Sequence, residues 1–148
     1  MTEPTLVSIL VADDDEEDHL LLRDALIEGR LRNPVEFVVD GEGLLDRLRG
    51  SGRYAGDPPR RLPGLILVDL DMPRMNGLEA IREIKADPTV RDIPLVVLTT
   101  STDEGDIDQS YDLGVASYIV KPVTFGALVD VMRELGRYWF DVVELPDA

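Results

Sequence analysis

The stretch from residue 65 to Gly77 constrains the fold of this chain more than any other. Its first four residues, 65–68, are all apolar and lead directly into Asp69, after which Pro73 and Gly77 mark a loop. A short apolar run followed by such a loop is typical of a strand that is buried on both faces, as in a parallel sheet. Asp69 then lies where the strand leaves the sheet, at the edge where open α/β sheets bind their ligands.

Apolar runs and helical patterns alternate along the whole chain. Strands are expected at residues 6–12, 35–39, 65–68, 93–98 and 117–120. Helices are expected after them, at residues 15–28, 43–49, 78–85, 103–113 and 125–136. Thr124 would cap the last helix. Its core-facing positions would be Phe125, Leu128, Val129, Met132 and Leu135. This alternation predicts one α/β domain, with a doubly wound five-stranded parallel sheet and helices on both faces.

The composition limits the classes of function. The 148 residues suffice for one domain, and 30 acidic against 15 basic residues give a net charge of −15. That charge opposes contact with nucleic acids and with anionic membrane surfaces. The sequence has no cysteine, no N-terminal signal segment and no apolar run long enough to span a bilayer. We therefore expect a cytoplasmic protein without nucleic-acid or membrane partners.

Side chains with the chemistry of phosphoryl transfer follow the predicted strands. Asp13 and Asp14 follow the first strand, Asp69 the third, Thr99 the fourth and Lys121 the fifth. Parallel strands place these positions at one edge, where three carboxylates repel one another unless a cation is bound or a proton is taken up. Such oxygen ligands suit Mg²⁺. Together with Lys121 and Thr99 they could stabilise a phosphoryl group carried on a carboxylate, as an aspartyl phosphate.

Four segments that occur in a fixed order give this chain a family resemblance. They are residues 9–14, 69–77, 97–99 and 118–122. With these segments the chain resembles a response-regulator receiver domain of two-component signalling. The resemblance implies a flavodoxin-like strand order of 2-1-3-4-5 for the predicted sheet.

The resemblance also implies a role for each acid of the predicted site. Asp69 would accept a phosphoryl group from a sensor histidine kinase. Asp14 would bind Mg²⁺ directly, and Asp13 would bind it through water or act as a second acid. Asp71 matches the position whose backbone carbonyl completes the metal site. Small phosphodonors would also phosphorylate such a protein, and it would slowly dephosphorylate itself.

The remaining roles implied by the resemblance concern signal transmission. Thr99 would donate to the phosphoryl group, and Tyr118 would move inward when Thr99 shifts. Lys121 would pair with the phosphoryl oxygens, across a cis bond to Pro122. By contrast, the acids at 15–18 are expected to form only a solvated helix start, and His19 is expected to be a surface residue.

Two further segments point to a subtype. We expect no output domain after the receiver domain, because the chain ends too soon for one. The Arg-rich insertion at 52–63 and the ending at 138–146 resemble single-domain regulators that partner bacterial phytochromes. A histidine-containing phosphotransfer protein is a further partner that such a regulator would use.

The end of the chain is predicted to mediate self-association. We expect the receiver domain to cover residues 1–136 and a C-terminal extension to cover 137–148. The extension carries a cluster of apolar side chains: Tyr138, Trp139, Phe140, Val142, Val143 and Leu145. An apolar patch of this kind usually marks an interface, and a two-fold homodimer is its simplest closed form. The alternative is that the extension packs on the last helix of its own chain.

Two alternatives of different function remain at the level of the sequence. Asp69 and Asp71 after an apolar strand also fit the nucleophile motif of haloacid-dehalogenase-like phosphatases. Pro73 and the position of the motif on the third strand argue against that interpretation. A flavodoxin-like FMN-binding module is the second alternative, but the chain lacks a hydroxyl- and Gly-rich phosphate loop after its first strand.

Overall fold

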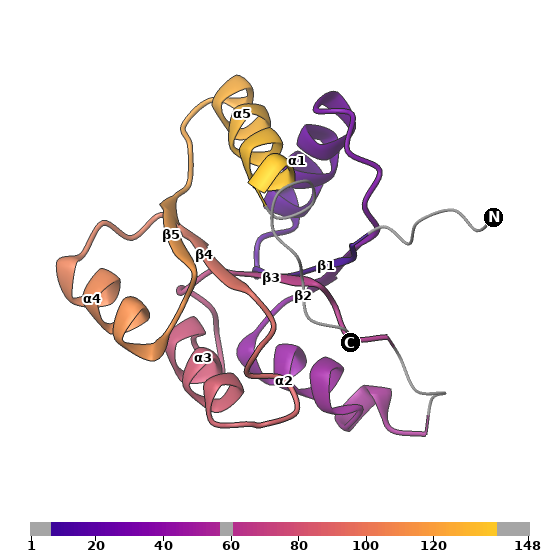
Figure 1. Ribbon diagram of the computed structural model, residues 1–148, viewed down its shortest axis with the longest axis vertical. Helices are drawn as coiled ribbons and strands as arrows, with labels where there is room; N and C mark the ends of the chain where they lie inside the picture. The colour runs from indigo at the N-terminus through magenta and orange to yellow at the C-terminus, as the bar shows by residue number, and fades with distance from the viewer. Residues whose placement is uncertain (1–6, 57–60, 139–148) are drawn as a thin grey trace.

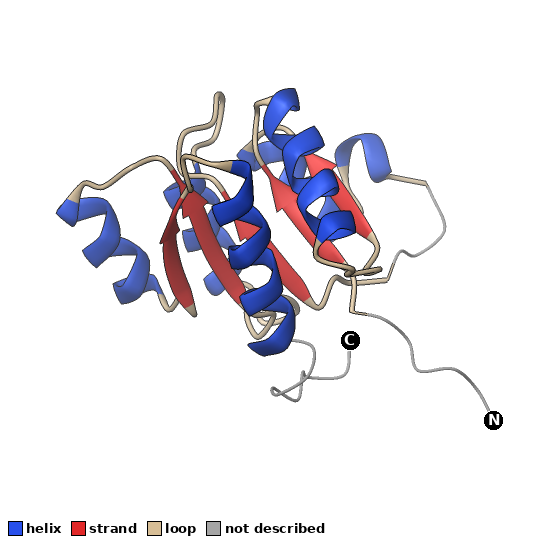
Figure 2. Ribbon diagram, turned by 90° about the horizontal axis from the view of Figure 1, so that it is seen from above, coloured by secondary structure: helices blue, strands red, loops and turns tan. Residues whose placement is uncertain are grey.

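The computed structural model describes residues 7–56 and 61–138. Its strands are β1 (Ile9–Ala12), β2 (Val35–Val38), β3 (Leu65–Val68), β4 (Leu95–Thr99) and β5 (Ser117–Val120). All neighbouring strands pair in parallel, in the order β2-β1-β3-β4-β5. The predicted five-stranded parallel sheet and its strand order are therefore confirmed. Figure 2 shows the strand arrows running in one direction.

Helices cover both faces of the sheet. They are α1 (Glu16–Glu28), α2 (Gly41–Arg49), α3 (Gly77–Lys85), α4 (Glu104–Leu113) and α5 (Phe125–Gly136), with a short 3-10 helix, η1 (Gly52–Tyr54), after α2. In Figure 1, α1 and α5 lie on one side of the sheet, and α2, α3 and α4 lie on the other. None of these helices within the described ranges is long and apolar enough to cross a membrane.

The sheet divides the apolar interior into two cores. Because side chains alternate along a strand, Leu65 and Leu67 of β3 pack with α1 and α5, whereas Ile66 and Val68 pack with α2 and α3. All four residues are almost fully buried. The central strand thus has the two-sided burial that its continuous apolar run predicts, and it holds Asp69 rigidly at its end.

The last helix faces the core with most of the predicted residues. Val129, Met132 and Leu135 are buried, and Leu128 is partly buried against them. Phe125, however, is exposed and not inward-facing. It is the first residue of α5, directly after the cap residue Thr124, at the end of the helix where fewer neighbours cover it.

Gly77 is needed for space and not for an unusual backbone angle. It starts α3 after the cap residue Asn76, and the left-handed residue of this loop is Arg74, with φ of 64°. A Cβ atom at Gly77 would collide with the carbonyl oxygen of Asp69 and would lie 2.7 Å from Cα of Leu70. The start of α3 therefore packs directly on the backbone that carries Asp69.

We expect Gly77→Ala to lower the free energy of unfolding by about 2 kcal/mol, because rigid backbone atoms must move to admit the methyl group. Urea denaturation would measure this loss. Gly126→Ala is the matched control, since a Cβ atom there meets nothing within 4 Å, and alanine is favoured over glycine in a helix. Equal stability of the two variants would contradict the proposed close packing.

Candidate functional site

Backbone hydrogen bonds carry the sheet one residue beyond its strands and fix the positions of the site residues. The N–H of Asp69 donates to the carbonyl of Ala12 at 2.9 Å, and the N–H of Asp13 donates to that of Val38 at 3.0 Å. On the other side, the N–H of Lys121 donates to the carbonyl of Thr99 at 2.7 Å. The predicted strand-end residues are thus brought together at one edge of the sheet.

Three carboxylates form the acidic centre of this edge. One oxygen each from Asp13, Asp14 and Asp69 lies within 4.8 Å of the other two. Asp13 and Asp69 are buried, whereas Asp14 is exposed at the mouth. Hard oxygen ligands around an opening to solvent suit a divalent cation that keeps several waters. The donor set therefore fits the metal that the sequence predicts.

The Lys121 ammonium lies among the acids. Its Nζ atom is 2.8 Å from Oδ2 of Asp13, 2.8 Å from Oδ2 of Asp69 and 2.6 Å from Oδ2 of Asp18. Burial alone lowers the pKa of Lys121, but these hydrogen bonds outweigh it and hold its pKa above the usual value. The ammonium stays charged and offsets part of the repulsion among the carboxylates.

The environment of Asp13 favours a proton on its carboxyl group. Burial raises the pKa of Asp13 from 3.8 to about 6, although hydrogen bonds from Lys121 and from the N–H of Asp15 act against the shift. The negative charge of Asp69 adds to the shift in the same direction as burial. At neutral pH the site therefore holds its negative charge at a cost in free energy.

The two oxygens of Asp69 have different partners. Oδ1 accepts from the Thr99 hydroxyl at 2.7 Å and from the N–H of Asp71 at 3.1 Å. Oδ2 accepts from Lys121 at 2.8 Å. The carboxylate is consequently held in one orientation. Thr99 is fully buried beside Asp69.

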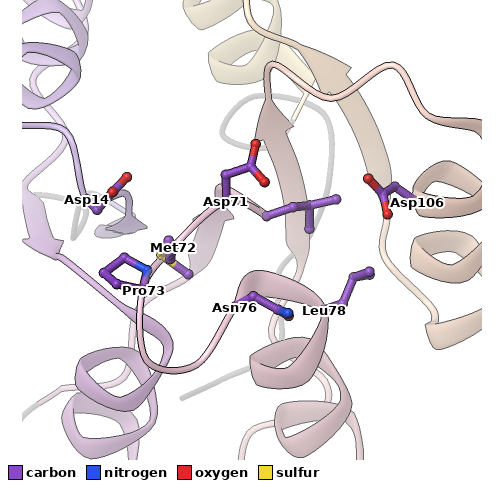
Figure 3. Close-up of a pocket in the computed structure, with 8 residues that line it drawn as sticks. Asp14, Asp71, Met72, Pro73, Asn76, Leu78 and Asp106 are labelled. Carbon is purple, nitrogen blue, oxygen red and sulfur yellow. The ribbon is translucent and has the colours of Figure 1, made fainter.

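An open pocket of about 430 Å³ adjoins the acidic centre. It is lined by Asp14, Leu70, Asp71, Met72, Pro73, Asn76, Leu78 and Asp106. Figure 3 shows Asp14 and Asp106 on opposite sides of it, with Asp71 between them. Among the described residues, the side chain of Asp71 lies outside the cluster of three carboxylates.

Comparisons with known proteins agree with this geometry. Residues 9–133 match the family described as response regulator receiver domain. The chain belongs to this family. Response regulator Rcp1 of Synechocystis is 34% identical over 140 residues, which cover 95% of this chain and 93% of Rcp1. Membership of the receiver family decides against the phosphatase and FMN-binding alternatives.

Solved structures of similar receiver domains share the whole fold. The phosphorylated cyanobacterial phytochrome response regulator RcpA is 37% identical, with a TM-score of 0.86 over 96% of this chain and 99% of RcpA. The response regulator RPA3017 in red-light signalling of R. palustris is 33% identical, with a TM-score of 0.88 over 97% of this chain and all of RPA3017. Rcp1 in its Mn²⁺-bound form is 33% identical, with a TM-score of 0.83 over 95% of this chain and 99% of Rcp1.

Three local expectations for this receiver domain are corrected by the structure. Asp18 is not only a solvated start of a helix, because it bonds Lys121. His19 is half-buried rather than on the surface: its ring stacks on Phe37 at 4.3 Å, and Nε2 lies 2.6 Å from the carbonyl oxygen of Asp13. The bond before Pro122 is trans, since no cis peptide occurs in the described residues.

No helical spacing in the sequence links Asp18 to the site, because Asp13 and Asp14 precede α1, which begins at Glu16 after the cap residue Asp15. The structure shows that Asp18, in the first turn of α1, accepts from Lys121, which follows β5.

Proposed function

We propose that the chain accepts a phosphoryl group on Asp69, with Mg²⁺ bound by the neighbouring acids. The observation that carries this proposal is the arrangement around Asp69. Its carboxylate is buried, and it is held by Thr99 on one oxygen and by Lys121 on the other. Phosphoryl transfer depends mainly on positioning and on neutralising charge, and both are prepared here.

No proton has to be transferred when the phosphoryl group passes from a phosphodonor to Asp69. An oxygen of Asp69 forms the new bond to phosphorus, and the bond between phosphorus and the leaving group breaks with its electron pair on the leaving group. Asp14, with Asp13 through water and Asp71 through its carbonyl, would hold the Mg²⁺, which neutralises charge on the phosphoryl oxygens. Lys121 and Thr99 would then donate to those oxygens.

Acetyl phosphate with Mg²⁺ tests the proposal. Incubation of the protein should add one phosphoryl group per chain, and peptide mapping after borohydride reduction should place it on Asp69. Modification of another residue, or no modification at all, would overturn the proposal. Slow loss of the label after the donor is removed would measure the autodephosphorylation that we expect.

We expect Mg²⁺ to raise the melting temperature of the wild type and to leave that of Asp14→Ala unchanged. At ten times its dissociation constant, the ion stabilises the folded state by about 1.4 kcal/mol, through binding to that state alone. Glu16→Ala, which removes an exposed acid from the first turn of α1, is the control and should retain the effect. Thermal unfolding between 0 and about 20 mM Mg²⁺ measures this rise in melting temperature. Melting curves of the wild type that do not change with Mg²⁺ would refute the metal assignment.

A path of hydrogen bonds supports a switch that runs from Asp69 to Tyr118. The Thr99 hydroxyl donates to Asp69, and the N–H of Ser101 lies 3.5 Å from the same hydroxyl oxygen. The carbonyl of Ser101 accepts from the Tyr118 hydroxyl at 2.9 Å. Burial raises the pKa of Tyr118, which keeps this donor protonated. A phosphoryl group that draws Thr99 toward itself would loosen this path and free the half-buried Tyr118 to move inward.

The partners proposed for this chain follow from its relatives. RcpA and Rcp1 are response regulators, and RcpA is described as a phytochrome response regulator. We propose a cytoplasmic sensor histidine kinase of the phytochrome type as the phosphodonor of this receiver domain. A histidine-containing phosphotransfer protein would receive the phosphoryl group from Asp69.

A groove beside β5 supports a homodimer as the second part of the proposal. It has a volume of about 580 Å³ and is lined by Ala116, Ser117, Ile119, Asp130, Val131, Glu134, Leu135 and Tyr138. Tyr138 is exposed, and the other predicted interface residues, from Trp139 to Leu145, lie outside the described residues. The apolar extension at 137–148 of a second copy would cover such a groove.

We expect light scattering to give the mass of a dimer for the full chain at tens of micromolar. A chain that ends at Gly136 should be a monomer, because it lacks the apolar extension. Beryllofluoride, added to mimic the phosphoryl group, would reveal whether the dimer depends on phosphorylation. A monomeric full chain both with and without beryllofluoride would exclude the dimer.

A further inference from the structure

Lys121 has a third acidic partner outside the segments that identify the family. An ammonium group has three N–H donors, and in this structure Asp13, Asp18 and Asp69 each lie within 2.8 Å of Nζ. Asp18 makes the shortest of the three contacts, at 2.6 Å. It belongs to α1, whereas Asp13 and Asp69 follow strands of the sheet. All three donors of Lys121 therefore have acidic acceptors, and one of these comes from a helix.

Asp18 helps to set the direction of the Lys121 N–H that faces Asp69. The N–H bonds of an ammonium point to the corners of a tetrahedron. When two of them are held by Asp13 and Asp18, the third can point only toward Asp69. Without Asp18, the ammonium would keep only Asp13 and Asp69 as acceptors, and Asp13 alone would anchor it once the N–H that faces Asp69 passes to a phosphoryl oxygen.

We propose that Asp18 is a positioning residue for phosphoryl transfer, which orients the Lys121 ammonium toward Asp69. This inference rests on the function proposed above. As Asp69 bonds to phosphorus, its oxygen loses negative charge, and the phosphoryl oxygens next to it retain theirs. One N–H of Lys121 then passes from Oδ2 of Asp69 to a phosphoryl oxygen. The bonds to Asp13 and Asp18 persist throughout, so the transferred group meets a donor that is already aimed at it.

The hydrogen bond from Lys121 to Asp18 is expected to speed phosphoryl transfer, whereas the negative charge of Asp18 is expected to slow it. The variants are chosen to separate these two effects. A carboxylate near the site repels an anionic phosphodonor, so its removal alone would accelerate the reaction. Asp18→Asn removes the charge but keeps an oxygen that can accept from Lys121. Asp18→Ala removes both the charge and the acceptor. Glu17→Gln and Glu17→Ala are matched controls, because Glu17 is exposed on the same turn of α1.

The first measurement is the initial rate of Asp69 phosphorylation by acetyl phosphate at saturating Mg²⁺. We expect Asp18→Ala to be about tenfold slower than Glu17→Ala, within the range of a hydrogen bond between charged groups. Asp18→Asn should remain within about twofold of Glu17→Gln, because its amide oxygen still anchors the ammonium. Equal rates for Asp18→Ala and Asp18→Asn would overturn the inference.

The second measurement needs neither Mg²⁺ nor a phosphodonor. The sequence contains only two lysines, Lys85 and Lys121, so protein labelled with [¹⁵N]lysine gives two ammonium signals. We expect the Lys121 ammonium to exchange slowly with water in the wild type and in Asp18→Asn, and rapidly in Asp18→Ala. The Lys85 signal serves as the internal reference. Rapid exchange in the wild type, or slow exchange in Asp18→Ala, would overturn the inference.

The two measurements also distinguish this inference from the proposed function. If the wild type shows a protected Lys121 signal that Asp18→Ala loses, but acetyl phosphate does not modify Asp69, the function has failed while the anchoring contact stands. If Asp69 is modified at the same rate in Asp18→Ala and Asp18→Asn, the function stands and the positioning role of Asp18 is wrong. Melting temperatures of all four variants confirm that each rate belongs to folded protein.

Discussion

Asp69→Asn should abolish phosphorylation by acetyl phosphate, while the wild type incorporates one group per chain. The amide has no anionic oxygen to form the bond to phosphorus, so the loss is expected to be complete. The fold should survive, because the amide oxygen can still accept from Thr99 and from the N–H of Asp71. Radiolabelled donor or intact-protein mass measures the incorporation.

The neighbouring acid provides the control for this experiment. Asp71→Asn changes only the side chain of Asp71, whereas its contact with Asp69 runs through its backbone N–H. We expect this variant to be phosphorylated. Incorporation of a phosphoryl group by Asp69→Asn would show that another residue is the acceptor, and it would overturn the assignment of the site.

Lys121→Met should lower the free energy of unfolding by about 3 kcal/mol at pH 7 and low Mg²⁺, because removing one partner of a buried ion pair leaves the other charges uncompensated. The side chains of Asp13 and Asp69 are 3% and 7% exposed, so water cannot replace the ammonium. Mg²⁺ should recover part of the loss, since it supplies positive charge to the same carboxylates. Urea denaturation with and without Mg²⁺ measures both effects.

The pH dependence of this loss has a definite sign. The pKa of Asp13 is about 6 in the folded protein and 3.8 as its ordinary value, so the folded state binds the proton more tightly than the unfolded state. A raised pKa in the folded state favours folding at low pH and loses that contribution as the pH rises through it. Lys121 lowers the pKa of Asp13, so removing it raises that pKa further, and the variant gains more stability than the wild type as the pH falls. The stability difference between wild type and Lys121→Met should therefore shrink as the pH falls from 7 to 5.

Lys85 offers the matched control for Lys121. It is the only other lysine of the sequence, and its ammonium donates to the carbonyl of Arg91 at 3.2 Å rather than to a cluster of acids. We expect Lys85→Met to cost less than about 1 kcal/mol. Similar losses for the two variants, or a loss for Lys121→Met that is independent of pH and Mg²⁺, would contradict the role given to the ammonium.

The site residues that could be predicted from the sequence are those that follow strands. A continuous apolar run identifies a buried strand, and the residue after it must lie at the edge of the sheet. Asp13, Asp69, Thr99 and Lys121 each occupy such a position, and the structure brings them together. Their proximity follows from the parallel direction of the strands, which short-range patterns are sufficient to indicate.

Residues that meet across different elements could not be predicted in the same way. Asp18 and His19 look like surface residues in the sequence, and Phe125 looks like a core residue. Whether a residue at the end of a helix faces the sheet depends on how the helix is rotated and where its axis lies. These are set by the packing of α1 and α5 on one core, which involves residues far apart in the chain.

The sequence by itself determined the fold class, the order of the elements and the edge of the sheet that carries the chemistry, because these depend on local periodicity and on the direction of parallel strands. Only the tertiary structure decided that Asp18 of α1 shares Lys121 with the acids of the sheet, and that Gly77 is needed for close packing on Leu70. Contacts of this kind depend on distances of a few ångströms between elements, which no pattern along the chain specifies.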